Sequence, residues 1–228
     1  MSYMATQYTV DDFQDITEPQ RTFLMAVHDD VRLRETFFFT GGTLLKARGI
    51  VPRISNDVDL FTFPTISSYD YLTHLQTLHR VLERIFGTDT IKETECGFLH
   101  TLSGMVIEAV HDATANIDDF VFFGALATTG LRDLAAHKAS ALCSRDEVKD
   151  YIDIAFLTHR EGWSLRDLET FAEKKFRLGT IREEHLVTEL LAKRETLTIP
   201  PAIFLRDPER NAALVAEQIE RLLNATTV

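Results

Sequence analysis

The sequence predicts an α/β (α+β) protein with a mixed β-sheet core flanked by helices and a helical carboxy-terminal lobe. Short β-favouring runs alternate with helical segments up to about residue 125, and from Leu131 the pattern is helical almost to the end. The length of 228 residues corresponds to about 1.5 typical domains. We therefore expect an α/β core over residues 1–125 and a helical lobe over residues 126–228.

Helix caps and glycines mark the boundaries of the first elements. Thr17 to Gln20 has the form of a capping box and contains a proline in the first turn, which predicts a helix from there to about Arg34. Residues 37–40 form a β-favouring run, which Gly41-Gly42 interrupts before a short helical stretch over 43–47.

A period-two pattern over residues 57–63 predicts the next strand. Successive side chains of a strand alternate between its faces, so Asp57 and Asp59 share one side and Val58 and Leu60 the other. Apolar residues at helical spacing predict a helix over 67–86 with Gly87 as its C-cap, and β-like stretches follow between residues 90 and 110.

The carboxy-terminal helices are separated by similar signals. Ser144 to Glu147 fits a capping box, which predicts one helix up to about Cys143 and another from Arg145 to about His159. Later helices are expected at 164–178, 181–195 and 208–224, with Pro200-Pro201 marking a connection.

Composition and charge exclude several classes of protein. The chain is 45% hydrophobic and 26% charged, a globular profile that excludes disordered and coiled-coil proteins. A net charge of −11 opposes the broad phosphate-binding surface of a non-specific nucleic-acid binder. Cys96 and Cys143 are too few for a disulfide scaffold or a thiolate zinc site, and with no signal-like start they favour a cytoplasmic protein. No uninterrupted apolar run reaches the length of a membrane span, so no membrane contact is expected.

One constellation points to chemistry: Gly41-Gly42-Thr43, then thirteen residues, then Asp57-Val58-Asp59. A glycine pair before a helix lets backbone N–H groups approach a phosphate. Two carboxylates on one strand face repel each other unless a cation lies between them, and their oxygens suit Mg²⁺. Each half alone is typical of ordinary turns and strand edges, and glycosyltransferases also use Asp-x-Asp. The order of strand, Gly-Gly-Thr, short helix and Asp-x-Asp strand favours a nucleotide site.

These residues carry a family resemblance. The segment GGTLLKARGIVPRISNDVDLF resembles the G-[GS]-[ST], spacer, D-x-[DE] signature of the DNA polymerase β-like nucleotidyltransferase superfamily. Residues 134–157, LAAHKASALCSRDEVKDYIDIAFL, resemble the second signature of its AbiEii/AbiGii toxin group, in which a Lys, an Arg and an Asp-x-x-Asp follow one another. The resemblance implies a nucleotidyltransferase-like core, with the helical lobe completing the active-site cleft.

The resemblance also implies roles for individual residues. The metal, Mg²⁺ or Mn²⁺, is expected on Asp57, Asp59 and a third acid, for which Glu108 is the candidate, although Asp112 lies only four residues on and Glu108 can equally be an exposed strand residue. One Asp of the Asp-x-x-Asp is expected to orient Lys138 or Arg145. The residues expected to take part in catalysis are Asp57, Asp59, Lys138, Asp150 and Asp153. Those expected to bind nucleotide are Gly41, Gly42, Thr43, Arg53, Ser55, Lys138 and Arg145.

The implied activity is a metal-dependent transfer of a nucleotidyl group from an NTP to an acceptor hydroxyl. The acceptor is expected to be RNA, such as tRNA, or a protein, and the chain to be the toxin of a toxin–antitoxin pair with a cognate antitoxin. Alternatives are a catalytically silent nucleotide- or partner-binding module and, less favoured, an Asp-x-Asp glycosyltransferase. The basic run Lys174-Lys175-Phe176-Arg177 predicts a solvated patch or, with an RNA acceptor, a phosphate-binding surface.

Overall fold

The chain divides into two compact units in the computed structural model, which describes residues 9–87, 91–94, 97–102, 105–177, 179 and 181–226, with only the backbone described for 91–94 and 97–102. Unit 1 comprises Met1–Arg48, Ser55–Ala115 and Asp119–Thr129. Unit 2 comprises Gly49–Ile54, Asn116–Asp118 and Gly130–Val228. Two short segments from the first half of the chain therefore belong to the helical unit.

Unit 1 contains a mixed sheet, which has seven strands within the described residues, in the order β3-β4-β5-β2-β1-β7-β6. Parallel pairing joins β2 to β5 and β1 to β7, and the other neighbours are antiparallel. The strands are β1 (Phe37–Thr40), β2 (Asp57–Thr62), β3 (Ile91–Thr94), β4 (Gly97–Leu102), β5 (Met105–Val110), β6 (Val121–Phe123) and β7 (Leu126–Thr128). The mixed α/β class predicted from the sequence is confirmed.

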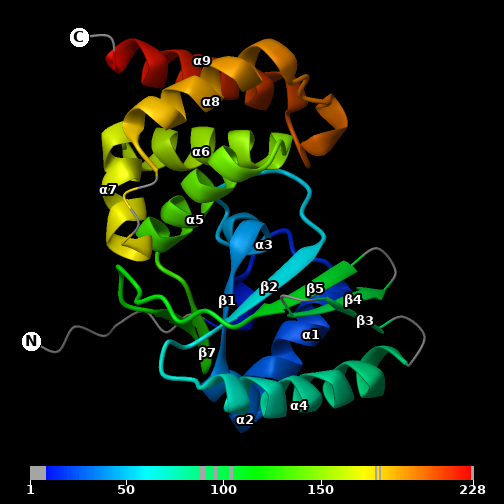
Figure 1. The fold of residues 1–228 in the computed structure, drawn as a ribbon. Coiled ribbons are helices and arrows are strands. Elements are labelled where there is room, and N and C mark those ends of the chain that lie inside the picture. Colours follow the sequence, from blue (N-terminus) through cyan, green and yellow to red (C-terminus); the bar gives the residue numbers. More distant parts are fainter. Residues whose placement is uncertain are drawn as a thin grey trace, which may run out of the picture. The chain divides into compact units, whose positions relative to one another are not determined.

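Helices α1, α2 and α4 lie together on one side of this sheet (Figure 1). The predicted capping box is present, since the Thr17 hydroxyl accepts from the Gln20 N–H and the Gln20 side chain accepts from the Thr17 N–H. The single helix predicted to reach Arg34 is wrong, because the Asp30 carboxylate accepts the Arg32 and Leu33 N–H groups and starts a new helix there. Unit 1 also begins with a 3-10 turn (Val10–Asp12), and its helices are α1 (Glu18–Asp29), α2 (Val31–Thr36), α3 (Gly41–Ala47) and α4 (Ser68–Phe86).

The core of unit 1 follows from the strand patterns. Phe37, Phe38 and Phe39 are at most 1% exposed, so β1 is covered on both of its faces. In β2 only every second side chain is fully buried, Val58 and Leu60 among them, as the period-two pattern predicts. Each such side chain contributes about 1.5–3 kcal/mol by leaving water. The opposite side of β2 is thereby left to Asp57 and Asp59.

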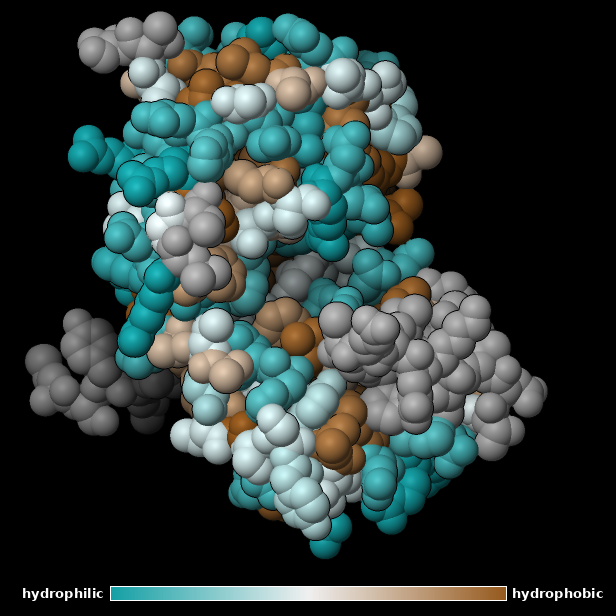
Figure 2. Space-filling view, in the orientation of Figure 1, coloured by the Kyte–Doolittle hydropathy of each residue, from teal (hydrophilic) through white to brown (hydrophobic). Residues whose placement is uncertain are grey.

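Unit 2 is helical. The predicted break between its first two helices is confirmed, but the predicted Ser144 cap is wrong: Ser144 is the last residue of α5, and the N-cap of α6 is Glu147, which makes no capping bond. The helices are α5 (Leu131–Ser144), α6 (Val148–Glu161), α7 (Leu165–Phe176), α8 (Glu183–Thr196) and α9 (Pro208–Ala225), with a 3-10 turn (Pro201–Ile203) between the last two. Figure 2 shows hydrophobic side chains over α8 and α9 on a face of this unit that is otherwise largely hydrophilic.

Two loop segments are fastened into unit 2 by their backbones. The Ile54 N–H donates to the Ile203 carbonyl (2.8 Å) and the Leu205 N–H donates to the Pro52 carbonyl (3.0 Å). In the second segment, Asn116–Asp118, the N–H groups of Ile117 and Asp118 donate to the Asp133 carboxylate of α5. Arg53 therefore sits in a loop held at both ends. None of the helices, as far as the structure describes them, is long and apolar enough to cross a membrane.

Candidate functional site

The glycine turn after β1 brings backbone and carboxylate into close contact. Gly41 has a φ of +78°, which L-residues adopt only with strain. A Cβ built on it would lie 1.7 Å from Asp59 Oδ2, so the carboxylate lies directly against the glycine backbone. The antiparallel register of β1 and β2 sets this up, because Thr40 pairs with Asp59. A side chain at position 41 would displace the second acid of the Asp-x-Asp.

A buried polar cluster fixes the loop that leads into β2. The Thr43 hydroxyl lies 2.9 Å from Ser55 Oγ and also donates to the Asp57 carbonyl. Lys46 Nζ donates to the Ser55 carbonyl (2.8 Å) and to Gln20 Oε1 (3.2 Å). Thr43 and Ser55 are 0% and 2% exposed, so in this structure their hydroxyls position the Asp-x-Asp strand, and nucleotide contact by either stays a prediction. Sequence reasoning placed Gln20 only in a helix cap and missed Lys46, because no local pattern links either residue to this loop.

Three carboxylates share one face of the sheet. Asp57 and Asp59 are half-buried on β2, and Glu108 is exposed on β5. The parallel register pairs Asp59 with Glu108, while Val58 pairs with Ile107 on the fully buried opposite face. Residues in register on neighbouring strands point to the same side, so Glu108 lies beside Asp59 on this face.

The donor chemistry of this face fits a hard divalent cation, because carboxylate oxygens are the ligands that Mg²⁺ takes. The side chains are not gathered into a cage: among the described side chains, no group of three or more His, Cys, Asp or Glu is arranged to hold a metal ion. Metal binding by Asp57, Asp59 and Glu108 therefore stays a prediction. Asp112, the alternative third acid, is buried and its Oδ1 accepts from Thr114.

Unit 2 contains a network of five alternating charges. Arg53 Nε and Nη2 donate to both oxygens of Asp153, at 2.6 and 2.7 Å. Lys138 Nζ lies 2.7 Å from Asp153 Oδ2 and 3.0 Å from Asp150 Oδ1. Arg145 Nε and Nη2 donate to Asp150 at 2.6 and 3.0 Å. Both carboxylates are fully buried, and each is shared by two cations.

The opposite charges of the network shift the pKa values of Lys138, Asp150 and Asp153 toward their ionised forms. Burial alone raises the pKa of Asp153, but Arg53 and Lys138 outweigh it and hold the pKa below its usual value. The pKa of Asp150 is likewise lowered against burial, by Arg145 and Lys138. Burial alone lowers the pKa of Lys138, but Asp153 and Asp150 raise it above the ordinary lysine value. Three cations face two anions, so the network carries one net positive charge.

The structure thus brings together four residues of the second signature and one from the first. Asp150 contacts both Lys138 and Arg145, and Asp153 joins Lys138 to Arg53. Arg145 has the most exposed side chain of the five, at 56%, whereas those of Arg53 and Lys138 are 2% and 9% exposed. Their contacts with a nucleotide stay predictions.

The basic run of α7 contains a buried charge. Lys175 was expected in a solvated patch, and that expectation is wrong for this residue: its Nζ lies 3.1 Å from Asp133 Oδ1 and 2.8 Å from Asn116 Oδ1, and both members of the ion pair have fully buried side chains. Asp133 also holds the 116–118 segment, so this pair fastens that loop to α5 and α7. Its neighbours Lys174 and Arg177 are exposed.

Comparison with known proteins finds distant relatives. The uncharacterized protein aq_aa25 of Aquifex aeolicus is 31% identical over 143 residues, which cover 62% of this chain and 66% of that protein. The matched region thus spans about two thirds of the relative's length. Two solved structures from Helicobacter pylori align over 90% or more of this chain. JHP933 has 16% identity, a TM-score of 0.49 and 89% of its own chain covered; a candidate nucleotidyltransferase has 15% identity, a TM-score of 0.49 and 97% covered.

A family model matches most of the chain. It is described as nucleotidyl transferase AbiEii toxin, type IV toxin–antitoxin system, and covers residues 22–227. The match includes the glycine turn, the Asp-x-Asp strand and the five-charge network. It confirms the predicted family and, with it, the enzyme class of nucleotidyltransferase. The chain belongs to the AbiEii family of nucleotidyl transferase toxins.

Proposed function

We propose that the protein is a metal-dependent nucleotidyltransferase that moves a nucleoside monophosphate from an NTP to an acceptor hydroxyl. The observation that carries the proposal is the carboxylate face of unit 1, where Asp57, Asp59 and Glu108 share one side of two parallel strands next to the Gly41 turn. In the reaction, the acceptor oxygen forms a bond to the α-phosphorus, and the bond from that phosphorus to the β-phosphate bridging oxygen breaks. Pyrophosphate leaves.

The chain's own residues have distinct tasks in this proposal. Asp57, Asp59 and Glu108 would hold Mg²⁺ or Mn²⁺, which when bound neutralises triphosphate charge. The backbone of the Gly41-Gly42 turn would accommodate phosphate oxygens where a side chain would collide. Glu108 is the exposed acid of the three, which supports the proposal that it takes the proton of the acceptor hydroxyl.

The ion network supplies positive charge in unit 2. Arg145 is the member whose side chain is most exposed, so it is the one that can reach a phosphate without unfolding its surroundings. Lys138 would act as a point charge held in place by Asp150 and Asp153. We assign Asp150, Asp153 and Arg53 as positioning residues, because their charges are engaged with one another inside the unit. The proposed acceptor is RNA, such as tRNA, or a protein, and the proposed partner is a cognate antitoxin.

The test uses two labels of the same NTP. The protein is incubated with Mg²⁺, total RNA and each NTP labelled either at the α- or the γ-phosphate. Nucleotidyl transfer places the α-label on the acceptor and releases the γ-label in pyrophosphate, whereas phosphoryl transfer does the reverse. Transfer of the γ-label to the acceptor, or equal α-transfer by Asp57→Ala and wild type, contradicts the proposal.

Matched variants separate the metal face from general charge effects. Asp57→Asn and Asp59→Asn are expected to lower transfer at least about 100-fold, because a metal ligand supports charge stabilisation of several kcal/mol. Glu35→Gln, an exposed acid of α2 in the same unit, is the control and should retain activity. Calorimetry covers the alternatives: NTP binding without transfer to any acceptor indicates a silent binding module, and preference for a UDP-sugar indicates a glycosyltransferase.

A further inference from the structure

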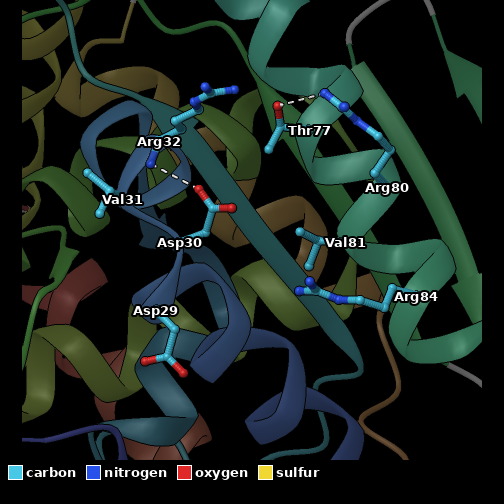
Figure 3. Close-up of a pocket in the computed structure, with 8 residues that line it drawn as sticks. All are labelled: Asp29, Asp30, Val31, Arg32, Thr77, Arg80, Val81 and Arg84. Carbon is cyan, nitrogen blue, oxygen red and sulfur yellow. Dashed lines mark hydrogen bonds between the residues drawn. The ribbon is translucent and has the colours of Figure 1, made fainter.

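Unit 1 has a groove on its helical side whose arginines play no part in the proposed chemistry. The groove has a volume of about 460 Å³ and lies between the α1–α2 junction and α4. Arg32 enters it from α2, and Arg80 and Arg84 enter it from α4. In Figure 3, Arg84 reaches across the groove from α4, and the guanidinium groups of Arg32 and Arg80 extend toward the same end.

The charge balance of this groove favours an anion. All three arginines are exposed, and among the described side chains no carboxylate forms an ion pair with any of them. Two acids also line the groove: Asp29 Oδ1 lies 2.8 Å from His28 Nδ1, and Asp30 Oδ1 accepts the N–H groups of Arg32 and Leu33. Three arginines against two carboxylates leave the groove with one net positive charge. Three guanidinium groups therefore face solvent together in a chain of net charge −11.

The outer face of α4 extends this surface with exposed apolar side chains. Tyr69 is 79% and Leu72 60% exposed, and Figure 2 shows hydrophobic side chains over this helix. Eleven residues make about three turns, so Tyr69 and Arg80 lie on one face of α4, about 16 Å apart along the helix axis. Arg84 lies one turn, about 6 Å, further along. Tyr69 and Arg80 thus lie on one line along α4, and Arg84 lies about 60° around the helix axis from Tyr69.

We propose that this surface, Tyr69 together with the Arg32, Arg80 and Arg84 groove, binds single-stranded nucleic acid. The arginines would contact successive backbone phosphates, and Tyr69 would stack on an unpaired base. A free phosphate would leave Tyr69 unexplained, and an apolar partner helix would leave the three arginines unexplained. The distance along α4 from Tyr69 to the arginines corresponds to a few nucleotides. A single-stranded oligonucleotide can bridge that distance, and a mononucleotide cannot. The surface involves none of the residues assigned to metal or NTP binding.

The test is a binding measurement without NTP, so that its outcome does not depend on transfer activity. A fluorescein-labelled 12-nucleotide single-stranded RNA is titrated with the full chain, and anisotropy is followed at several KCl concentrations. Arg80→Gln with Arg84→Gln is expected to lower the slope of log K against log salt by about 1.4, because each lost phosphate contact on a single strand lowers it by about 0.7. Affinity at low salt should fall at least about fivefold.

The control removes the same charge elsewhere. Arg166→Gln with Arg210→Gln deletes two exposed arginines from unit 2 and should leave the slope unchanged. Tyr69→Ala should weaken binding about fivefold or more through lost stacking, and Tyr69→Phe should restore it. An equal loss in both arginine pairs overturns the proposal, because net charge alone would then explain binding. So does equally tight binding of a duplex of the same length or of polyglutamate, or no binding of the RNA by the wild-type protein.

Discussion

Asp153 is the residue on which the five-charge network depends most. Its two oxygens accept hydrogen bonds from Nε and Nη2 of Arg53, and one of them also contacts Lys138 Nζ. Its side chain is fully buried. Asp153→Asn removes the anion, so the buried Arg53 side chain, 2% exposed, loses the negative charge of Asp153. Removal of one partner from a buried ion pair costs about 3–5 kcal/mol, because the remaining charge stays buried and is not solvated by water. Lys138 keeps Asp150, so we expect a loss within this range.

The assay is urea unfolding followed by the emission of Trp163. The chain has one tryptophan, which lies in unit 2 and packs against Phe171 with ring centroids 4.9 Å apart, so its emission reports this unit. Glu220→Gln is the matched control: it breaks the Arg194–Glu220 pair, which has a contact of 2.7 Å but side chains 40% and 50% exposed. Because solvent screens that pair, the control should cost less than about 1 kcal/mol.

A double-mutant cycle tests the reasoning itself. Arg53→Met removes the stranded cation, so Arg53→Met with Asp153→Asn should cost clearly less than the sum of the single variants, with a coupling of about 1–3 kcal/mol. A loss below about 1 kcal/mol for Asp153→Asn, or strictly additive effects, would refute the claim that burial makes this pair interdependent.

Three further predictions concern other contacts. Gly41→Ala should destabilise the protein by about 1–3 kcal/mol more than Gly162→Ala, measured by urea unfolding followed by circular dichroism. Both glycines have a positive φ, but of the two only Gly41 would bring the new Cβ against another side chain. Equal losses of stability in the two variants would contradict this. The stability of unit 2 should fall as the pH drops below about 4, because the pKa values of Asp150 and Asp153 are lower in the folded than in the unfolded state. It should fall again in strong alkali, where the raised pKa of Lys138 is passed. If Asp153→Asn lost stability in acid just as the wild type does, the prediction would be contradicted. Lys175→Met should cost about 3–5 kcal/mol, against less than about 0.5 kcal/mol for the exposed neighbour Lys174→Met, with Trp163 emission as the measurement.

Local patterns predicted the elements that carry the candidate site, and contacts between distant segments lay beyond them. The period-two run at Asp57 and the glycines at 41–42 are local signals, so β2 and the glycine start of α3 could be placed from the sequence. The pairing of Arg53 with Asp153 spans 100 residues and depends on the strand-like contact of the 52–54 loop with residues 203–205, for which no periodicity exists. The burial of Lys175 likewise depends on Asp133, on another helix. The β6–β7 hairpin was missed because its strands have only three residues each.

The two aspartate pairs of this chain resemble each other in sequence and differ in burial and in the charges around them. Asp150 and Asp153 are three residues apart on α6, fully buried, and each already neutralised by two cationic side chains of unit 2. A metal ion there would have to displace guanidinium and ammonium groups whose own burial would then be uncompensated. Asp57 and Asp59 are two residues apart on a strand, half-buried, and share their face with the exposed Glu108. Burial and the neighbouring charges, more than the motif, therefore support our proposal that the metal binds at the strand pair, whereas the helix pair holds Lys138 and Arg53.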